Sequence, residues 1–109
     1  MLKREIEVTL TYEALHFWAN ADSLPKVAFL KHPHRHLFEI TLRKRVSEND
    51  RQIEFILFKR EVLDYLARYE HDFGGQSCEM IAEELLTHFD CSLVKVMEDG
   101  ENGAVLTKE

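Results

Sequence analysis

The strongest constraint on this chain is an alternation that begins near its start. The even positions carry apolar side chains and end on a histidine: Ile6, Val8, Leu10, Tyr12, Ala14 and His16. The odd positions from 5 to 13 are all Glu or Thr. A period of two predicts a β-strand over residues 4–16 with one covered face, and it places His16 at the end of the covered row. The fold must therefore contain a sheet with something packed on one side.

The same alternation returns at residues 34–46. His34, His36 and Phe38 share one face, opposite residues such as Arg43 and Arg45. This predicts a second strand. Residues 19–33 lose the pattern and predict an irregular loop, long for a compact domain, and the polar residues 47–51 predict a turn.

The rest of the chain mixes helical and strand patterns. A short third strand is predicted at residues 52–57, a helix at 58–68, a break at 71–75 and a second helix at 78–89 with Ser77 as its N-cap. Residues 92–98 alternate again, and two Asx-Gly pairs predict a tight turn before a return strand at 104–107.

These elements predict an α+β fold in a single domain of residues 1–109. We expect a mostly antiparallel, four-stranded sheet with the two helices on one face. The other face of such a small sheet would need cover, which indicates closure by oligomerisation.

Composition narrows the possible partners. The formal net charge of −6 disfavours binding to nucleic acid. Residues 1–60 hold eleven Lys and Arg against eight Asp and Glu, and residues 61–109 hold three against twelve, so an anion site is expected in the first half. No apolar stretch reaches the roughly 20 residues that span a bilayer, and no signal-peptide core is present. We therefore expect a cytoplasmic protein with no membrane partner, whose Cys78 and Cys91 are reduced thiols.

Three histidines form a candidate metal site. His34 and His36 leave the same face of a strand with Cα atoms about 6.7 Å apart. Two imidazoles at this spacing can bind one Zn²⁺, and His16 from a neighbouring strand would complete a three-ligand site with one open position. Two alternatives are polar surface histidines and a set that uses His32 with His34 and His36, which Pro33 disfavours.

Five motifs occur in order along the chain: YEALH at residues 12–16, HRHLF at 34–38, EFILFK at 54–59, SCE at 77–79 and VKVME at 94–98. They resemble the motifs FxAAH, HGHxF, DFxxLK, PTxE and VxVxET of the 6-pyruvoyl-tetrahydropterin synthase and 6-carboxy-tetrahydropterin synthase family. The resemblance implies the T-fold, in which sheets of several subunits join into a barrel with active sites between subunits. It implies a trimer or a homo-hexamer built as a dimer of trimers.

The resemblance also implies an activity and its residues. It makes three residues the Zn²⁺ ligands: His16, His34 and His36. It makes Glu98 the carboxylate that binds the N–H edge of a pterin or purine-like ring, and it makes His71 with Glu70 the proton-transferring pair. The implied reaction is that of a carbon–oxygen or carbon–carbon lyase acting on 7,8-dihydroneopterin triphosphate or a related pterin, as in tetrahydropterin or queuosine biosynthesis.

The sequence departs from the family in its proton-transfer groups. Family members usually carry a general-base cysteine four residues before the first histidine of HxH, and this chain has Leu30 there. The PTxE motif becomes Gln76-Ser77-Cys78-Glu79, which keeps the helix cap at Ser77 but leaves Cys78 at a helix N-terminus, where a thiol pKa can be lowered. A non-catalytic zinc- and pterin- or purine-binding T-fold protein is therefore the alternative function.

A second departure concerns charge near the histidines. The middle Gly of HGH is Arg35, and the preceding loop carries Lys26, Lys31 and His32. These residues are either a solvated basic loop or the groups that face a triphosphate.

Overall fold

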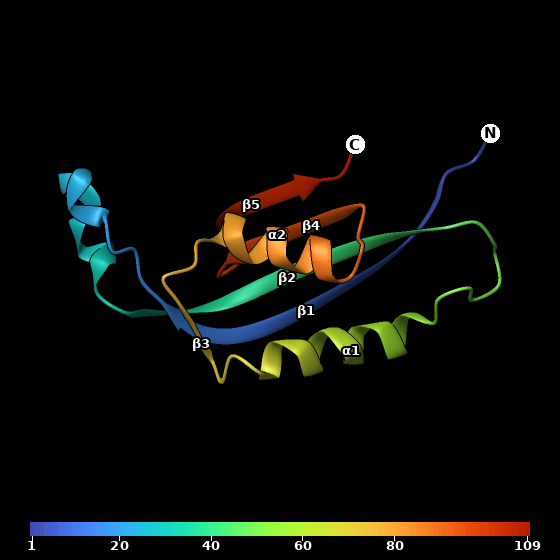
Figure 1. Ribbon diagram of the computed structural model, residues 1–109, viewed down its shortest axis with the longest axis horizontal. Coiled ribbons are helices and arrows are strands. Elements are labelled where there is room, and N and C mark those ends of the chain that lie inside the picture. Colours follow the sequence, from blue (N-terminus) through green and yellow to red (C-terminus); the bar gives the residue numbers. More distant parts are fainter.

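The computed structural model covers residues 1–109 and contains one five-stranded sheet with two α-helices (Figure 1). In chain order the elements are β1 (Arg4–His16), the 3₁₀ helices η1 (Ala21–Ser23) and η2 (Pro25–Lys31), β2 (His34–Val46), α1 (Phe55–Ala67), β3 (Asp72–Gly74), α2 (Cys78–His88), β4 (Leu93–Glu98) and β5 (Asn102–Thr107). The strand order is β3-β1-β2-β4-β5. All pairs are antiparallel except β1 with β3. The α+β class is confirmed, but the sheet is five-stranded and mixed rather than four-stranded.

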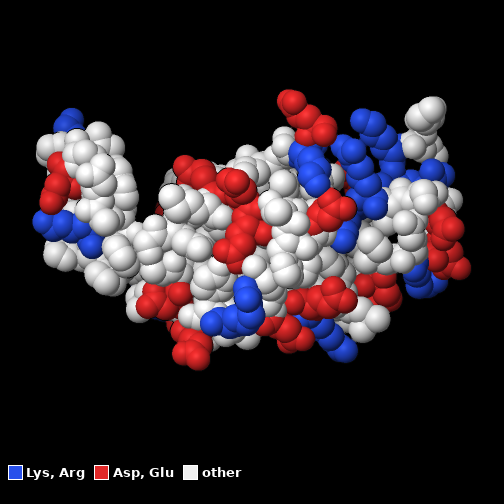
Figure 2. Space-filling view, in the orientation of Figure 1, with Lys and Arg blue, Asp and Glu red and all other residues white.

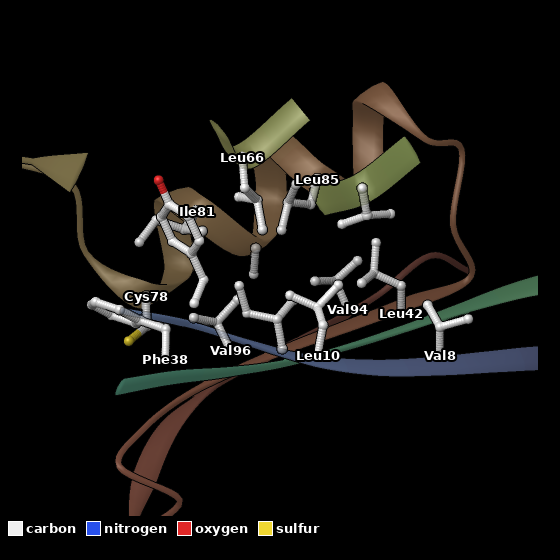
Figure 3. Close-up of a cluster of buried hydrophobic side chains, with 14 of the residues drawn as sticks. Val8, Leu10, Phe38, Leu42, Leu66, Cys78, Ile81, Leu85, Val94 and Val96 are labelled. Atoms are coloured by element: carbon white, nitrogen blue, oxygen red, sulfur yellow. The ribbon is translucent and has the colours of Figure 1, made fainter. Parts of the chain in front are cut away.

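A hydrophobic core lies between the two α-helices and one face of the sheet (Figure 3). The sheet contributes Phe38, Ile40 and Leu42 from β2, none of which has exposed surface. The helices contribute their buried stripes: Phe58, Val62 and Leu66 from α1, and Cys78, Ile81, Ala82 and Leu85 from α2. Both helices therefore cover the same face, which is also the face that carries His16.

The β1–β2 ladder is the longest pairing in the sheet. Its register runs from Arg4 opposite Val46 to His16 opposite His34. Both strands have the bounds that alternation predicted. The covered side chains of β1 are buried from Val8 onward, while the odd residues face the other side of the sheet. The ladder thus brings the two histidine-bearing segments together at one end.

The third strand expected at residues 52–57 does not form. The Glu54 carboxylate accepts hydrogen bonds from the backbone N–H groups of Ile56 (3.2 Å) and Leu57 (3.1 Å), which makes it the N-cap of α1. The helix begins at Phe55, three residues earlier than predicted. Phe55, Ile56 and Leu57 are each more than half exposed. The apolar run that suggested a strand is therefore the exposed first turn of a helix.

Two segments predicted to be irregular contain regular structure. The break at residues 71–75 includes β3, which pairs in parallel with the end of β1. Residues 17–33, hereafter the arm, project from one end of the sheet and contain η1 and η2 (Figure 1). The base of the arm is closed where the Trp18 N–H donates to the Leu30 carbonyl at 2.8 Å. Neither α-helix has the length and apolar composition needed to cross a bilayer.

Candidate metal centre

The three histidines selected by strand parity meet where the arm joins the sheet. His16 lies directly opposite His34 in the ladder, and His36 lies two residues further along β2. One ligand atom of each ring lies within 4.8 Å of the other two. Their ring centroids are 4.6 to 5.3 Å apart in edge-on contacts. This cluster can hold a metal ion.

Each of the three rings is oriented by a hydrogen bond at Nδ1. The acceptors are the Gln76 carbonyl for His16 (3.0 Å), the His32 carbonyl for His34 (2.8 Å) and an Asp99 carboxylate oxygen for His36 (2.7 Å). Carbonyl and carboxylate oxygens only accept, so Nδ1 of each neutral ring carries the proton and Nε2 carries a free lone pair. Metal-ligating histidines are held in this way by acceptors behind them.

The Nε2 atoms of two of these rings have no hydrogen-bond partner. Nε2 of His16 and Nε2 of His36 are both buried, and the Glu98 carboxylate oxygens that lie 3.0 and 3.6 Å from them only accept hydrogen bonds, so they leave the two lone pairs unsatisfied. Buried polar atoms are nearly always satisfied, because an unmade hydrogen bond costs about 1 to 3 kcal/mol. A metal ion would satisfy these lone pairs. Three imidazole nitrogens are a donor set of open zinc sites, so the cluster fits the ion that the resemblance implies.

Glu98 at the end of β4 reaches into the same space. Its Oε2 lies 3.0 Å from Nε2 of His16, and its Oε1 lies 3.6 Å from Nε2 of His36. In a tetrahedral zinc site with bonds of about 2.1 Å, neighbouring ligand atoms are about 3.4 Å apart. Glu98 therefore lies where either a fourth ligand or a group contacting a zinc-held molecule would lie.

A pocket of about 350 Å³ opens beside the histidines. Besides the histidine-bearing ends of β1 and β2, its walls come from the arm, from the segment that leads into α2 with its first turn, and from the facing ends of β4 and β5. The lining residues are His16, Phe17, Trp18, Leu30, His34, Gly75, Ser77, Cys78, Glu79, Met80, Glu98, Asn102 and Gly103. A volume of this size is at the lower end of the range for small-molecule sites. Leu30, at the position of the family cysteine, thus lies in the pocket wall.

The Cys78 thiol is buried and lies against the Glu98 carboxylate, with Sγ 3.7 Å from Oε2. Burial, and after it the negative charge of Glu98, raises the pKa of Cys78 to about 12. A helix N-terminus can lower a thiol pKa, but at Cys78 these two effects outweigh the helix dipole. The protonated thiol acts as a hydrogen-bond donor to Glu98.

The predicted proton-transferring pair lies outside the pocket of its own chain. The exposed His71 ring stacks on Tyr12 with centroids 4.8 Å apart, and its Nδ1 is 2.6 Å from the Glu13 carbonyl oxygen. Glu70 is also exposed, and both residues of the pair have positive φ angles. Neither lines the pocket. Within one chain, the structure brings Glu98 to the histidines but not His71.

The basic residues suggested for a triphosphate do not line the pocket either. Arg35 lies on the opposite face of β2 from the histidines and binds the Glu13 carboxylate at 2.6 Å. Lys31 lies 3.3 Å from Asp22 within the arm.

Sequence reasoning did not identify the groups that orient the histidines. The Asx-Gly pattern predicts only a turn at Asp99, although a carboxylate next to Glu98 at a strand end is a usable signal. Its Oδ1 accepts from the Leu37 N–H at 2.9 Å while its Oδ2 holds His36. The Leu37 N–H and, after it, the His36 contact hold the pKa of Asp99 below its usual value. The Gln76 and His32 carbonyls carry no sequence signal.

Asp99→Asn is expected to weaken Zn²⁺ binding by about 10- to 100-fold, because it weakens the acceptor behind His36. Asn tolerates the φ of +55° found at this position, so the turn should survive. Competition with a chromophoric chelator measures the affinity. Asp90→Asn is the matched control, because Asp90 also has a positive φ but pairs with Lys108 instead. Equal weakening in both variants would contradict this role for Asp99.

No protein-family model matches the sequence, and no curated protein matches it at a significant level.

Proposed function

We propose that this protein is a zinc-dependent T-fold lyase of the tetrahydropterin synthase type that acts on a reduced pterin. The observation that carries the proposal is the convergence of three oriented histidines beside a small pocket that also contains Glu98. Bound zinc would polarise the hydroxyl groups of the substrate side chain and lower their pKa.

Glu98 is the proposed anchor for the heterocycle. A carboxylate offers two acceptor oxygens, which match the adjacent N–H donors of a pterin ring in a bidentate pair. The Glu98 side chain is about one-quarter exposed, so such a pair would be partly shielded from water. Phe17 and Trp18 line the same pocket and offer apolar faces to a flat ring.

Proton transfer would depend on the assembly of several subunits into an oligomer. The resemblance implies active sites between subunits, where His71 and Glu70 of one subunit would serve the pocket of another. The sheet has edges available for such pairing, because β5 is terminal and β3 pairs only with the last two residues of β1. Pairing of edges around a symmetry axis would close the sheets into a barrel.

Sedimentation velocity at micromolar concentration is expected to give a trimer or a hexamer, because ring closure removes exposed sheet edges. A monomer over the whole concentration range would contradict the assembly and, with it, the role proposed for His71.

The alternative is a non-catalytic zinc- and pterin- or purine-binding protein of the same fold. It is favoured by Leu30, which puts an apolar side chain at the position of the family's base. The raised pKa of Cys78 also removes the nearest thiol as a substitute base.

Glu98→Gln is expected to weaken binding of 7,8-dihydroneopterin to the zinc-loaded protein by about 1.5 to 3 kcal/mol, the range for a hydrogen bond to a charged group. Isothermal titration calorimetry measures the affinity, and elemental analysis of the same samples measures zinc. Glu101→Gln, in the exposed turn after β4, is the control. If Glu98→Gln removes zinc and the pterin affinity follows the zinc content, Glu98 is a fourth ligand and not the pterin anchor.

A further inference from the structure

We infer that Tyr69 and Glu84 are positioning residues for the metal centre, because they hold Gln76, whose backbone carbonyl orients the His16 ring. The inference rests on the metal centre of the proposed function and concerns the residues behind one of its ligands. Tyr69 lies two residues after α1, Gln76 two residues before α2, and Glu84 within α2. None of these three lines the pocket.

The acceptor behind His16 is the one that no strand fixes in place. The acceptor behind the second ring belongs to the segment that leads into β2, and the Asp99 carboxylate behind the third ring also accepts from the backbone of β2. The Gln76 carbonyl lies 60 residues along the chain from His16 and follows Gly74 and Gly75. Gly74 has a φ of +61°, and consecutive glycines leave the backbone many conformations. Other contacts of Gln76 must therefore set the position of its carbonyl.

The Gln76 side chain reaches the Glu84 carboxylate. Its Nε2 lies 3.5 Å from Oε1 of Glu84. The other atom of the amide, Oε1 of Gln76, is buried and has no hydrogen-bond partner, which is rare for a buried polar atom. The contact at Nε2 is therefore the only hydrogen bond that fixes the direction of this side chain.

Two tyrosines in turn fix Glu84. The Tyr69 hydroxyl donates to Oε1, the oxygen that faces Gln76, and the Tyr65 hydroxyl donates to Oε2 at 2.7 Å. Burial, and after it the hydrogen bond to Glu84, raises the pKa of Tyr69 to about 12, so this hydroxyl keeps its proton. Burial opposes ionisation of Glu84, but the hydrogen bonds that it accepts and the Arg68 charge hold its pKa below the usual value. Glu84 is therefore an ionised acceptor between protonated donors.

Cations contribute little to holding Glu84. Its one ion pair is with Arg68 at 3.9 Å, and the Arg68 side chain is more than half exposed. Exposed pairs of this kind are weak. The largest group of Lys and Arg side chains in Figure 2 lies near the two chain ends, at the opposite end of the molecule from the arm. The hydroxyl and amide donors are therefore the main partners of this carboxylate.

A row of packed rings also joins Tyr69 to His16. The rings between them are Phe73 and Phe38, and successive centroids lie 5.0 to 5.2 Å apart. Removal of the whole Tyr69 side chain would disturb this packing as well as the hydrogen bond. Tyr69→Phe keeps the ring and removes only the hydroxyl, so it tests the hydrogen bond alone.

Proton NMR of the Co²⁺-loaded protein tests the inference, because Co²⁺ accepts imidazole ligands as Zn²⁺ does and shifts the Nδ1–H signal of each bound ring away from the rest of the spectrum. Overhauser contacts assign each signal to its ring. The test variants are Tyr69→Phe, Glu84→Gln and Gln76→Leu. Each should broaden the His16 signal alone, because its proton exchanges faster with water once the carbonyl can move.

The same variants should bind Zn²⁺ about three- to tenfold more weakly in competition with a chromophoric chelator. This is less than the loss of about 10- to 100-fold expected when an orienting group is itself removed, since the carbonyl remains present. Tyr65→Phe is the matched control, because it removes a hydroxyl from the oxygen of Glu84 that does not face Gln76. Its signals and its Zn²⁺ affinity should match the wild type.

Thermal melting of every variant separates positioning from stability. An unchanged His16 signal in the three test variants overturns the inference and leaves the metal centre intact. Broadening of all ligand signals together with a lower melting temperature, or an equal effect in Tyr65→Phe, also overturns it, because Glu84 would then only stabilise the fold. If the wild type binds neither Co²⁺ nor Zn²⁺, the proposed function fails and the inference fails with it.

Discussion

Alanine at any one of the three converging histidines is expected to remove most of the zinc from the purified protein. The wild type should hold about one zinc per chain, because three imidazole nitrogens and one open position make a complete site of the catalytic kind. Two imidazoles alone do not make a complete site. The variants His16→Ala, His34→Ala and His36→Ala should therefore each retain little zinc after dialysis against a weak chelator. Elemental analysis of the dialysed protein gives the number of zinc ions per chain.

His32→Ala is the decisive control for this experiment. His32 orients His34 through its backbone carbonyl at 2.8 Å, and this contact does not depend on the imidazole of His32. The variant should therefore keep its zinc. Loss of zinc in His32→Ala together with retention in His16→Ala would mean that the ligands come from a single strand, against the geometry of the ladder.

Leu30→Cys is expected to raise the rate of pterin side-chain cleavage by about 10²- to 10⁴-fold, the usual contribution of a general acid or base. Leu30 lines the pocket, and its backbone carbonyl, which accepts from Trp18, remains in place when the side chain changes. Zinc content should not change. Single-turnover product formation from 7,8-dihydroneopterin and from its triphosphate measures the rate.

Leu24→Cys controls for the addition of a thiol to the arm. Leu24 is about half exposed, lies in the same segment and does not line the pocket. It should have no effect on the rate. Rapid turnover by the wild type that survives His71→Ala and is not raised by Leu30→Cys would place the base on another residue, with Lys31 or His32 of the arm the first to test.

Local patterns predicted the long strands and the histidine cluster for a physical reason. A period of two depends only on the pleat of a strand, so the bounds of β1 and β2 and the shared face of His34 and His36 follow from the sequence. His16 joins them because the two strands pair with His16 opposite His34.

The features that were missed depend on contacts that a local pattern does not contain. The start of α1 is decided by the Glu54 cap, which outweighs the strand propensity of the aromatic residues after it. β3 is three residues long and exists because it pairs with the end of β1. Asp99 and the Gln76 carbonyl reach the histidines across about sixty residues of sequence, so their role appears only once the sheet is assembled.

The placement of His16 opposite His34 at the last pair of the β1–β2 ladder has a consequence for folding. A shift of pairing by one residue would turn one strand over relative to the other, so that His16 would face away from His34 and His36. A metal that needs all three rings on one face would bind only the correctly paired hairpin. At a free concentration of 100 times its Kd, such an ion stabilises the state that binds it by about 2.7 kcal/mol. Zinc binding would then favour the correct register of β1 and β2 over misaligned pairings of the two strands, which residues 17–33 connect.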